Sequence, residues 1–111
     1  MRVLVAEFVA WHARRHQVAR IVQYELTALP QPDYDLVVDL RRRTDSVVRS
    51  LIEEGVGSGA FRTPDIRSAS RAVLSLGIDV ARWYTPDSKP DPESLGAEYA
   101  DLVLAMLGAT G

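Results

Sequence analysis

The 111-residue sequence contains no cysteine. Disulfide bonds, thiolate metal sites and thiol redox chemistry are therefore excluded, and a reducing cytosolic environment is allowed. The chain also lacks an excess of positive charge, because 13 lysines and arginines against 15 aspartates and glutamates give a net charge of −2. That balance is unlike the basic surface of a nucleic-acid-binding domain. With 47% hydrophobic and 25% charged residues, the composition is typical of a globular protein.

Long apolar runs are missing as well. The first stretch, MRVLVAEFVAWHARRH, resembles a signal peptide only faintly, since Glu7 interrupts the apolar run and no small-residue cleavage site follows. No segment is long enough to span a bilayer. These features predict a cytoplasmic protein that makes no use of a membrane. The length predicts one domain over residues 1–111.

Sustained alternation of apolar and polar residues, the pattern of a half-buried strand, does not occur either. Instead, large apolar residues recur three or four positions apart from Val3 to about Leu29, with no proline or glycine between them. This spacing predicts one helix of roughly 40 Å, longer than so small a domain needs to pack on itself. Pro30 and Pro32 end it.

Two more helices follow with the same spacing. The second begins after Asp33, which is suited to cap it, and ends at Gly55 or Gly57, since either glycine can adopt the left-handed conformation of a helix C-terminus. The third begins at Thr63-Pro64-Asp65, a capping residue followed by a first-turn proline and a first-turn acid. It ends at Pro86.

A fourth helix begins at Asp91-Pro92-Glu93 and closes at Gly108, so the sequence predicts an all-α fold of about four helices in an antiparallel, bundle-like arrangement. The last two helices carry more apolar surface than the first two can cover. Two such helices from each of two subunits would form a four-helix bundle that buries the excess. We therefore predict a homodimer whose interface contains Val73, Leu76, Val80, Trp83, Tyr84, Tyr99, Leu102, Val103 and Met106.

Polar residues interrupt the apolar face of the first helix. Arg15 lies in register with that face, and Glu25 does so ten residues later, about 15 Å along a straight helix, which is too far for the two to neutralise each other. Each must form an ion pair elsewhere or meet water or a ligand, and both interpretations stay open. If these polar groups anchor a ligand in an apolar cavity, the candidate binding residues are Trp11, His12, Arg15, Tyr24 and Glu25.

His12 and His16 lie four residues apart, the spacing of paired metal ligands on a helix. No glutamate follows the first histidine as in HExxH, no cysteine is present, and no third ligand can be identified. We therefore predict no metal site. No GxSxG, P-loop or GxGxxG occurs, and no serine or threonine has a recognisable neighbouring base, so we predict neither a catalytic residue nor a cofactor.

The remaining charged clusters favour solvated surface. The consecutive arginines Arg41 to Arg43 fan across a helix and cannot form one stripe, and acidic residues lie nearby. On the third helix a polar stripe runs beside the apolar one, and its commonest explanation is solvent exposure. Its members are Arg71, Ser75, Asp79 and Arg82.

The order of these elements resembles a known family. The sequence is similar to the C-terminal effector-binding and dimerisation domain of TetR-type transcriptional regulators, over essentially all 111 residues. The similarity lies in a long helix that is followed by the segments LIEEGVGSGAFRTPDI, DVARWYTPD and PESLGAEYADLVL. The resemblance implies that the first two helices wall a ligand cavity and that the last two form the dimer bundle. Arg82-Trp83-Tyr84 followed by Pro86-Asp87 resembles a subset whose ligands are often acyl-CoA thioesters or related lipid-degradation intermediates.

The helix-turn-helix domain of such repressors does not occur in this sequence. We therefore expect the chain to bind a small hydrophobic ligand and to dimerise, but not to bind nucleic acid by itself. In a complete repressor, the resemblance implies that ligand binding biases two arrangements of the dimer. The alternatives are a ligand-free helical dimerisation scaffold or a small metal-dependent enzyme.

Overall fold

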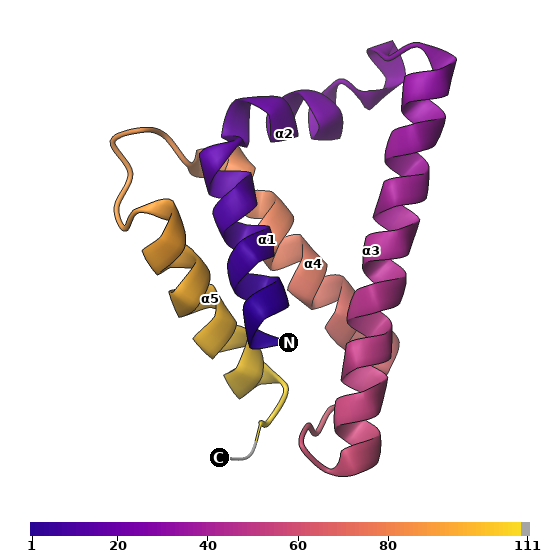
Figure 1. The fold of residues 1–111 in the computed structure, drawn as a ribbon, viewed down its shortest axis with the longest axis vertical. Coiled ribbons are helices and arrows are strands. Elements are labelled where there is room, and N and C mark those ends of the chain that lie inside the picture. Colours follow the sequence, from indigo (N-terminus) through magenta and orange to yellow (C-terminus); the bar gives the residue numbers. More distant parts are fainter. Residues whose placement is uncertain (110–111) are drawn as a thin grey trace.

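The computed structural model describes residues 1–109 as helices joined by short connections (Figure 1). These are α1 (Arg2–Arg14), α2 (His16–Tyr24), the 3-10 turn η1 (Leu26–Ala28), α3 (Gln31–Ser58), α4 (Ile66–Trp83) and α5 (Pro92–Met106). Residues 1–109 contain no strand, which confirms the predicted all-α class. None of the helices in this range is both long and apolar enough to cross a membrane.

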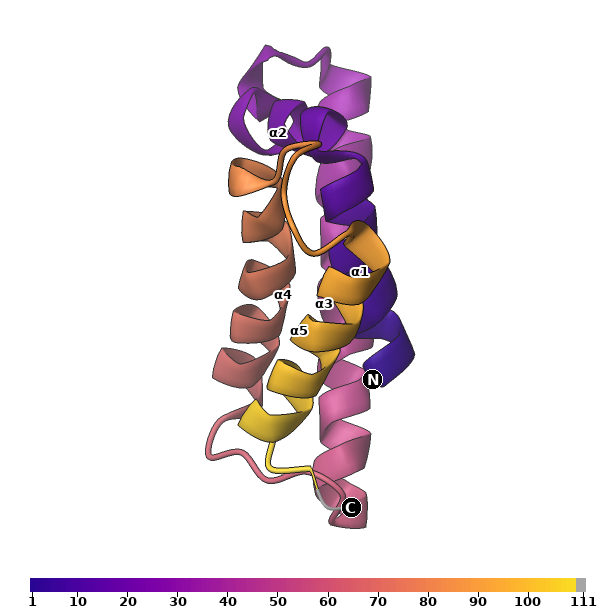
Figure 2. The same cartoon turned by 90° about the vertical axis from the view of Figure 1, so that its left-hand side faces the viewer.

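The core forms around α1, which packs on α5 along most of its length and on α4 beside it (Figure 2). Small and medium-sized apolar side chains of these helices are buried against one another. The C-terminal half of α3 packs on α4 and closes this side of the core. The buried residues include Val5, Val9, Ala13, Val48, Ile52, Val73, Val80, Leu95, Val103 and Leu107.

The segment expected to form one helix from Val3 to about Leu29 is divided at Arg15. The backbone of Arg15 has φ −108° and ψ 35°, outside the helical values, so α1 ends before it and α2 continues in another direction (Figure 1). The turn η1 then follows α2. The prediction of a continuous first helix was therefore wrong, although its residues are helical on both sides of the break.

A side chain of α2 accounts for the new direction. Arg20 reaches the C-terminal end of α4, where Nε donates to the carbonyl oxygen of Ala81 at 2.5 Å and Nη2 donates to that of Tyr84 at 2.9 Å. The last carbonyls of a helix lack partners within the helix and lie at the negative end of its dipole. A guanidinium there satisfies them, so Arg20 fixes α2 across the end of α4.

The end of α3 also differs from the prediction. α3 continues through Gly55 and Gly57 to Ser58, and Gly59, with φ 83°, takes the left-handed conformation that was expected at one of the earlier glycines. Gly55 is needed for another reason, since a Cβ atom there would lie 2.0 Å from the ring of Phe61. Phe61 packs against the core from the loop that follows.

Among the described α-helices, only α4 begins with a side-chain cap that forms hydrogen bonds. Asp65 rather than Thr63 is the N-cap of α4, and its carboxylate accepts hydrogen bonds from two backbone N–H groups of the first turn, at 3.0 and 3.3 Å. α3 begins with Pro30 at its N-cap, so Asp33 lies in the first turn, where its charge complements the helix dipole. Asp91 precedes α5 as expected.

α3 is held by its second half only. Its buried residues are Val48, Ile52 and Gly55, and no residue from Gln31 to Val47, all of them in the described part of the chain, is buried. α4 is the helix on which α3 packs, and the two diverge toward the N-terminal end of α3, where α2 lies between them (Figure 1). This divergence leaves space between α2, α3 and α4.

Candidate functional site

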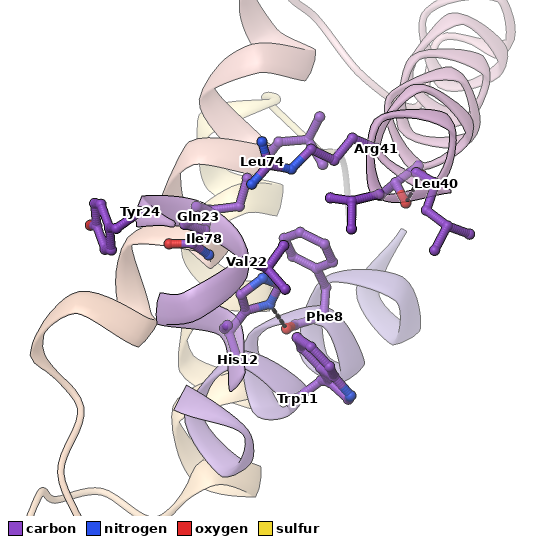
Figure 3. A pocket seen from close by; sticks show the side chains of 13 residues that line it. Phe8, Trp11, His12, Val22, Gln23, Tyr24, Leu40, Arg41, Leu74 and Ile78 are labelled. Atoms are coloured by element: carbon purple, nitrogen blue, oxygen red, sulfur yellow. Dashed lines mark hydrogen bonds between the residues drawn. The ribbon is translucent and has the colours of Figure 1, made fainter. Parts of the chain in front are cut away.

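A cavity of about 670 Å³ occupies the space between these helices (Figure 3). This volume lies in the range of roughly 300–1,000 Å³ typical of small-molecule sites. The wall is mostly apolar. Among the described residues that form it, Arg41 is the only one with a permanently charged side chain. We call it the α1–α4 cavity. It is lined by Phe8, Trp11, His12, Ala19, Val22, Gln23, Tyr24, Val37, Leu40, Arg41, Thr44, Leu74 and Ile78.

Each helix contributes residues that its own periodicity places on one face. On α3, the lining residues lie at positions 37, 40, 41 and 44, which repeat at three and four residues. On α1, Phe8 and Trp11 face them across the cavity (Figure 3). Phe8 can approach α4 because Gly77 has no side chain, and a Cβ atom there would lie 2.4 Å from the Phe8 ring. The packing of Phe8 against α4 thus sets one wall of the cavity.

His12 is the one titratable residue that α1 contributes to the wall, and it is only 8% exposed. Its Nδ1 atom lies 2.8 Å from the backbone carbonyl oxygen of Phe8, which can only accept, so Nδ1 carries a proton and donates it (Figure 3). Burial lowers the pKa of His12 below 6.5, and the bond to Phe8 opposes this only in part. A neutral ring protonated at Nδ1 leaves Nε2 as a hydrogen-bond acceptor.

The residues predicted from the sequence to bind ligand fall into two groups. Trp11, His12 and Tyr24 line the α1–α4 cavity, although Tyr24 is 63% exposed and its ring points away from the other labelled side chains in Figure 3. Arg15 and Glu25 do not line it, because they lie at the two ends of α2 and are exposed. The binding role of all five residues stays a prediction.

The second histidine takes part in neither the cavity nor a metal cluster. Nδ1 of His16 lies 3.0 Å from the carbonyl oxygen of Ala13, across the break between α1 and α2. Within residues 1–109, no three or more histidines, aspartates or glutamates come together in a group that could hold a metal ion. Sequence reasoning did not identify the lining residues of α3 and α4, because the apolar ones lie on ordinary apolar helix faces and Arg41 was assigned to solvated surface.

The residues predicted for a dimer interface also divide. Val73, Val80, Tyr84 and Val103 are at most 5% exposed in the single chain, because they pack in its own core. These four have almost no surface to offer a partner in the single chain, and their place in an interface stays a prediction. The other five keep exposed surface on α4 and α5 and stay a prediction: Leu76, Trp83, Tyr99, Leu102 and Met106.

Comparison with known proteins gives one consistent result. Residues 1–107 match the family described as "Tetracyclin repressor-like, C-terminal domain". The HTH-type transcriptional repressor KstR2 of Mycolicibacterium smegmatis is 28% identical over 101 residues, which cover 86% of this chain and 48% of that protein. The crystal structure of a bacterial regulatory protein in the tetR family from Rhodococcus RHA1 superimposes with a TM-score of 0.86 at 38% identity, over 99% of this chain and 58% of that one. The chain therefore spans about half the length of these relatives.

Proposed function

This chain belongs to the tetracycline repressor-like family of transcriptional regulators and corresponds to the C-terminal domain of that family. We propose that it senses a small hydrophobic ligand in the α1–α4 cavity and that it joins two regulator subunits. The family is regulatory and not enzymatic. The observation that carries the proposal is the cavity itself, because a large apolar cleft with a few polar groups in its wall is where small-molecule sites usually lie.

We assign the ligand to the acyl-CoA thioesters and related intermediates of lipid degradation. The wall supports this class, since it offers apolar and aromatic surface for a hydrocarbon body and one cation, Arg41, for an electron-rich group. The resemblance of the segment Arg82-Trp83-Tyr84 to acyl-CoA-responsive regulators points the same way. Trp11 and His12 would contact the hydrocarbon body from α1.

A matched pair of substitutions on α2 tests the cavity. Val22 lines it, whereas Val18, one turn earlier on the same helix, is 48% exposed and does not. Val22→Trp is expected to fill the cavity and abolish binding of fatty acids and acyl-CoA thioesters in native mass spectrometry, while Val18→Trp binds as the unchanged chain does. Equal binding by the two variants would show that the ligand lies elsewhere, and no binding by the unchanged chain would favour a scaffold.

The proposed dimer rests on the exposed apolar side chains of α4 and α5. Leu102 on α5 is 60% exposed, and Leu36 on α3 is a matched control at 57%. Leu102→Glu is expected to convert a dimer into a monomer in sedimentation analysis, because a charge buried at an interface without a partner is costly. Leu36→Glu is expected to stay dimeric. A monomeric parent chain, or a Leu36→Glu variant that dissociates equally, would contradict the assignment of this face.

α4 connects the two proposed sites. Leu74 and Ile78 line the cavity, while Leu76 and Trp83 of the same helix keep surface for a partner. A ligand that shifts α4 would therefore change the dimer contact. Such coupling is reciprocal, so a ligand that tightens the dimer must itself bind the dimer more tightly than the monomer. Dimer dissociation measured with and without dodecanoyl-CoA tests this, and an unchanged dissociation constant would show that the two sites are not coupled.

A further inference from the structure

A second cavity, of about 450 Å³, lies between α3 and α4 next to the first. Most of its side chains are charged or polar, in contrast to the α1–α4 cavity. We call it the arginine cavity after three of the residues that line it: Asp45, Arg49, Arg67, Arg71, Leu74, Ser75 and Ile78.

The arginine cavity has a positive balance although the whole chain is net negative. Asp45 is the only acidic residue among the described residues of its wall. Its carboxylate is already held by two partners, since it accepts from the Arg49 guanidinium at 2.9 Å and from the Ser70 hydroxyl at 3.2 Å. Asp45 therefore neutralises Arg49 and leaves the charges of Arg67 and Arg71 uncompensated within this wall.

Arg49 keeps one donor atom for which this wall supplies no acceptor. Its Nε atom is buried and has no hydrogen-bond partner among residues 1–109. A buried donor without a partner costs free energy, typically about 1–3 kcal/mol. An anion in the arginine cavity would meet the charges of Arg67 and Arg71, whereas Nε of Arg49 is itself shielded from the cavity. Guanidinium groups suit carboxylate and phosphate oxygens because they donate paired hydrogen bonds in a fixed plane.

The two cavities adjoin each other. Leu74 and Ile78 belong to the walls of both, and on α4 they follow Arg71 at three and seven residues, so all three share one face. On α3, Arg41 of the first cavity and Arg49 of the second lie eight residues apart on one face, with Asp45 between them. A molecule whose body occupies the first cavity could thus extend an end into the second.

We propose that the arginine cavity binds the anionic end of the ligand whose apolar body occupies the α1–α4 cavity. The inference rests on the proposed function and makes it more specific, because it requires an acid and gives Arg49, Arg67 and Arg71 the role of selecting it. A carboxylate of a free acid and a phosphate of a CoA thioester share the necessary chemistry. The polar stripe of α4 then acquires a function at Arg71 and Ser75, while Asp79 and Arg82 pair with each other at 2.7 Å.

Three probes with the same hydrocarbon chain test the proposal by isothermal titration calorimetry on the 111-residue chain: dodecanoate, methyl dodecanoate and dodecanoyl-CoA. The variant is Arg67→Gln combined with Arg71→Gln, two exposed residues whose loss leaves the core intact. The control is Arg43→Gln, which removes an arginine of α3 that forms an ion pair with Asp39 and lines neither cavity.

We expect the double variant to bind at least one anionic probe about tenfold more weakly, because this is the loss of affinity that removal of one charge-assisted hydrogen bond causes. Its affinity for the ester should be unchanged. The control is expected to bind all three probes unchanged. Weakening of dodecanoate alone would identify a carboxylate, and weakening of dodecanoyl-CoA alone would identify a phosphate. Raising the salt concentration is expected to weaken the affected probe and not the ester.

The proposal is overturned if the double variant binds all three probes as the parent chain does. In that case binding of the ester, and its loss in Val22→Trp, would still support the proposed function. It is also overturned if Val22→Trp leaves ester binding intact, because the apolar body then lies outside the α1–α4 cavity. A parent chain that binds none of the probes would reject both this inference and the assigned ligand class.

Discussion

Replacement of Arg20 by methionine is expected to loosen the junction between α2 and α4. Methionine keeps the length and apolar stem of the side chain but removes the guanidinium, which donates to the carbonyl oxygens of Ala81 and Tyr84 and, at 3.3 Å, to that of Arg82. These carbonyls would then have only water as a partner. Because α2 forms one wall of the α1–α4 cavity, ligand binding should weaken with stability.

The expected loss of stability follows from the exposure of the site. Hydrogen bonds from a charged donor contribute about 1.5–3 kcal/mol when buried, but Arg20 is only half-buried and water can replace part of the interaction. We therefore expect a loss of about 1–2 kcal/mol in the free energy of unfolding. For a chain of 111 residues, this corresponds to a fall in Tm of about 4–8 °C.

Thermal denaturation followed by circular dichroism measures this shift, at one protein concentration, because the proposed dimerisation would make Tm depend on protein concentration. Arg42→Met is the matched control, since Arg42 is an exposed helix residue that lines neither cavity. If the Arg20 and Arg42 variants melt at the same temperature, Arg20 does not hold α2 in place. The explanation given for the break at Arg15 would then fail with it.

Three further changes have expected outcomes. Gly77→Ala should lower stability by about 1–3 kcal/mol through overpacking against Phe8, which exceeds the gain of about 1 kcal/mol in helix propensity; a more stable variant in thermal denaturation would contradict the close contact. Burial lowers the pKa of His12 in the folded state, so the unfolded chain binds the proton more readily and the free energy of unfolding should fall as the pH drops below 6.5. Urea denaturation at several pH values should show a weaker fall for His12→Gln than for the parent chain. Hydrogen bonds from the backbone N–H and the hydroxyl of Ser68 lower the pKa of Asp65 in the folded state. The stabilising effect of the carboxylate should therefore be complete above pH 3.8 and vanish as the pH falls through the lower pKa of the folded state. Asp65→Ala should be less stable than the parent chain at neutral pH and equally stable in strong acid.

The helices were predictable because their ends are marked by local chemistry. Prolines and glycines separate α3, α4 and α5 in the sequence, and Asp91 could be recognised as a cap. The break at Arg15 was not predictable, because no proline or glycine lies near it and each neighbouring residue is compatible with a helix. It depends on a contact between Arg20 and a carbonyl 61 residues away, and such tertiary contacts override local propensity.

The same break explains why only part of the candidate site could be found. Trp11 and His12 lie within α1, where the expected register holds, and both line the cavity. Glu25 was placed by extending that register along a straight helix, which ends at Arg15. Lining residues such as Leu40 and Leu74 were missed, because the periodicity of a single helix shows which face is apolar and not where two helices diverge.

The first half of α3 has a consequence for the energetics of ligand recognition. From Gln31 to Val47 this helix has no buried residue, yet it supplies four residues of the cavity wall. Tertiary packing supplies most of the stability of a helix in a protein, and this half has little of it, so without a ligand it should open locally and its backbone amides should exchange with deuterium quickly. A ligand would act as the piece of hydrophobic core that the sequence omits. Part of its binding free energy would then go into ordering α3, and bound and free chains would differ in amide protection more than in shape.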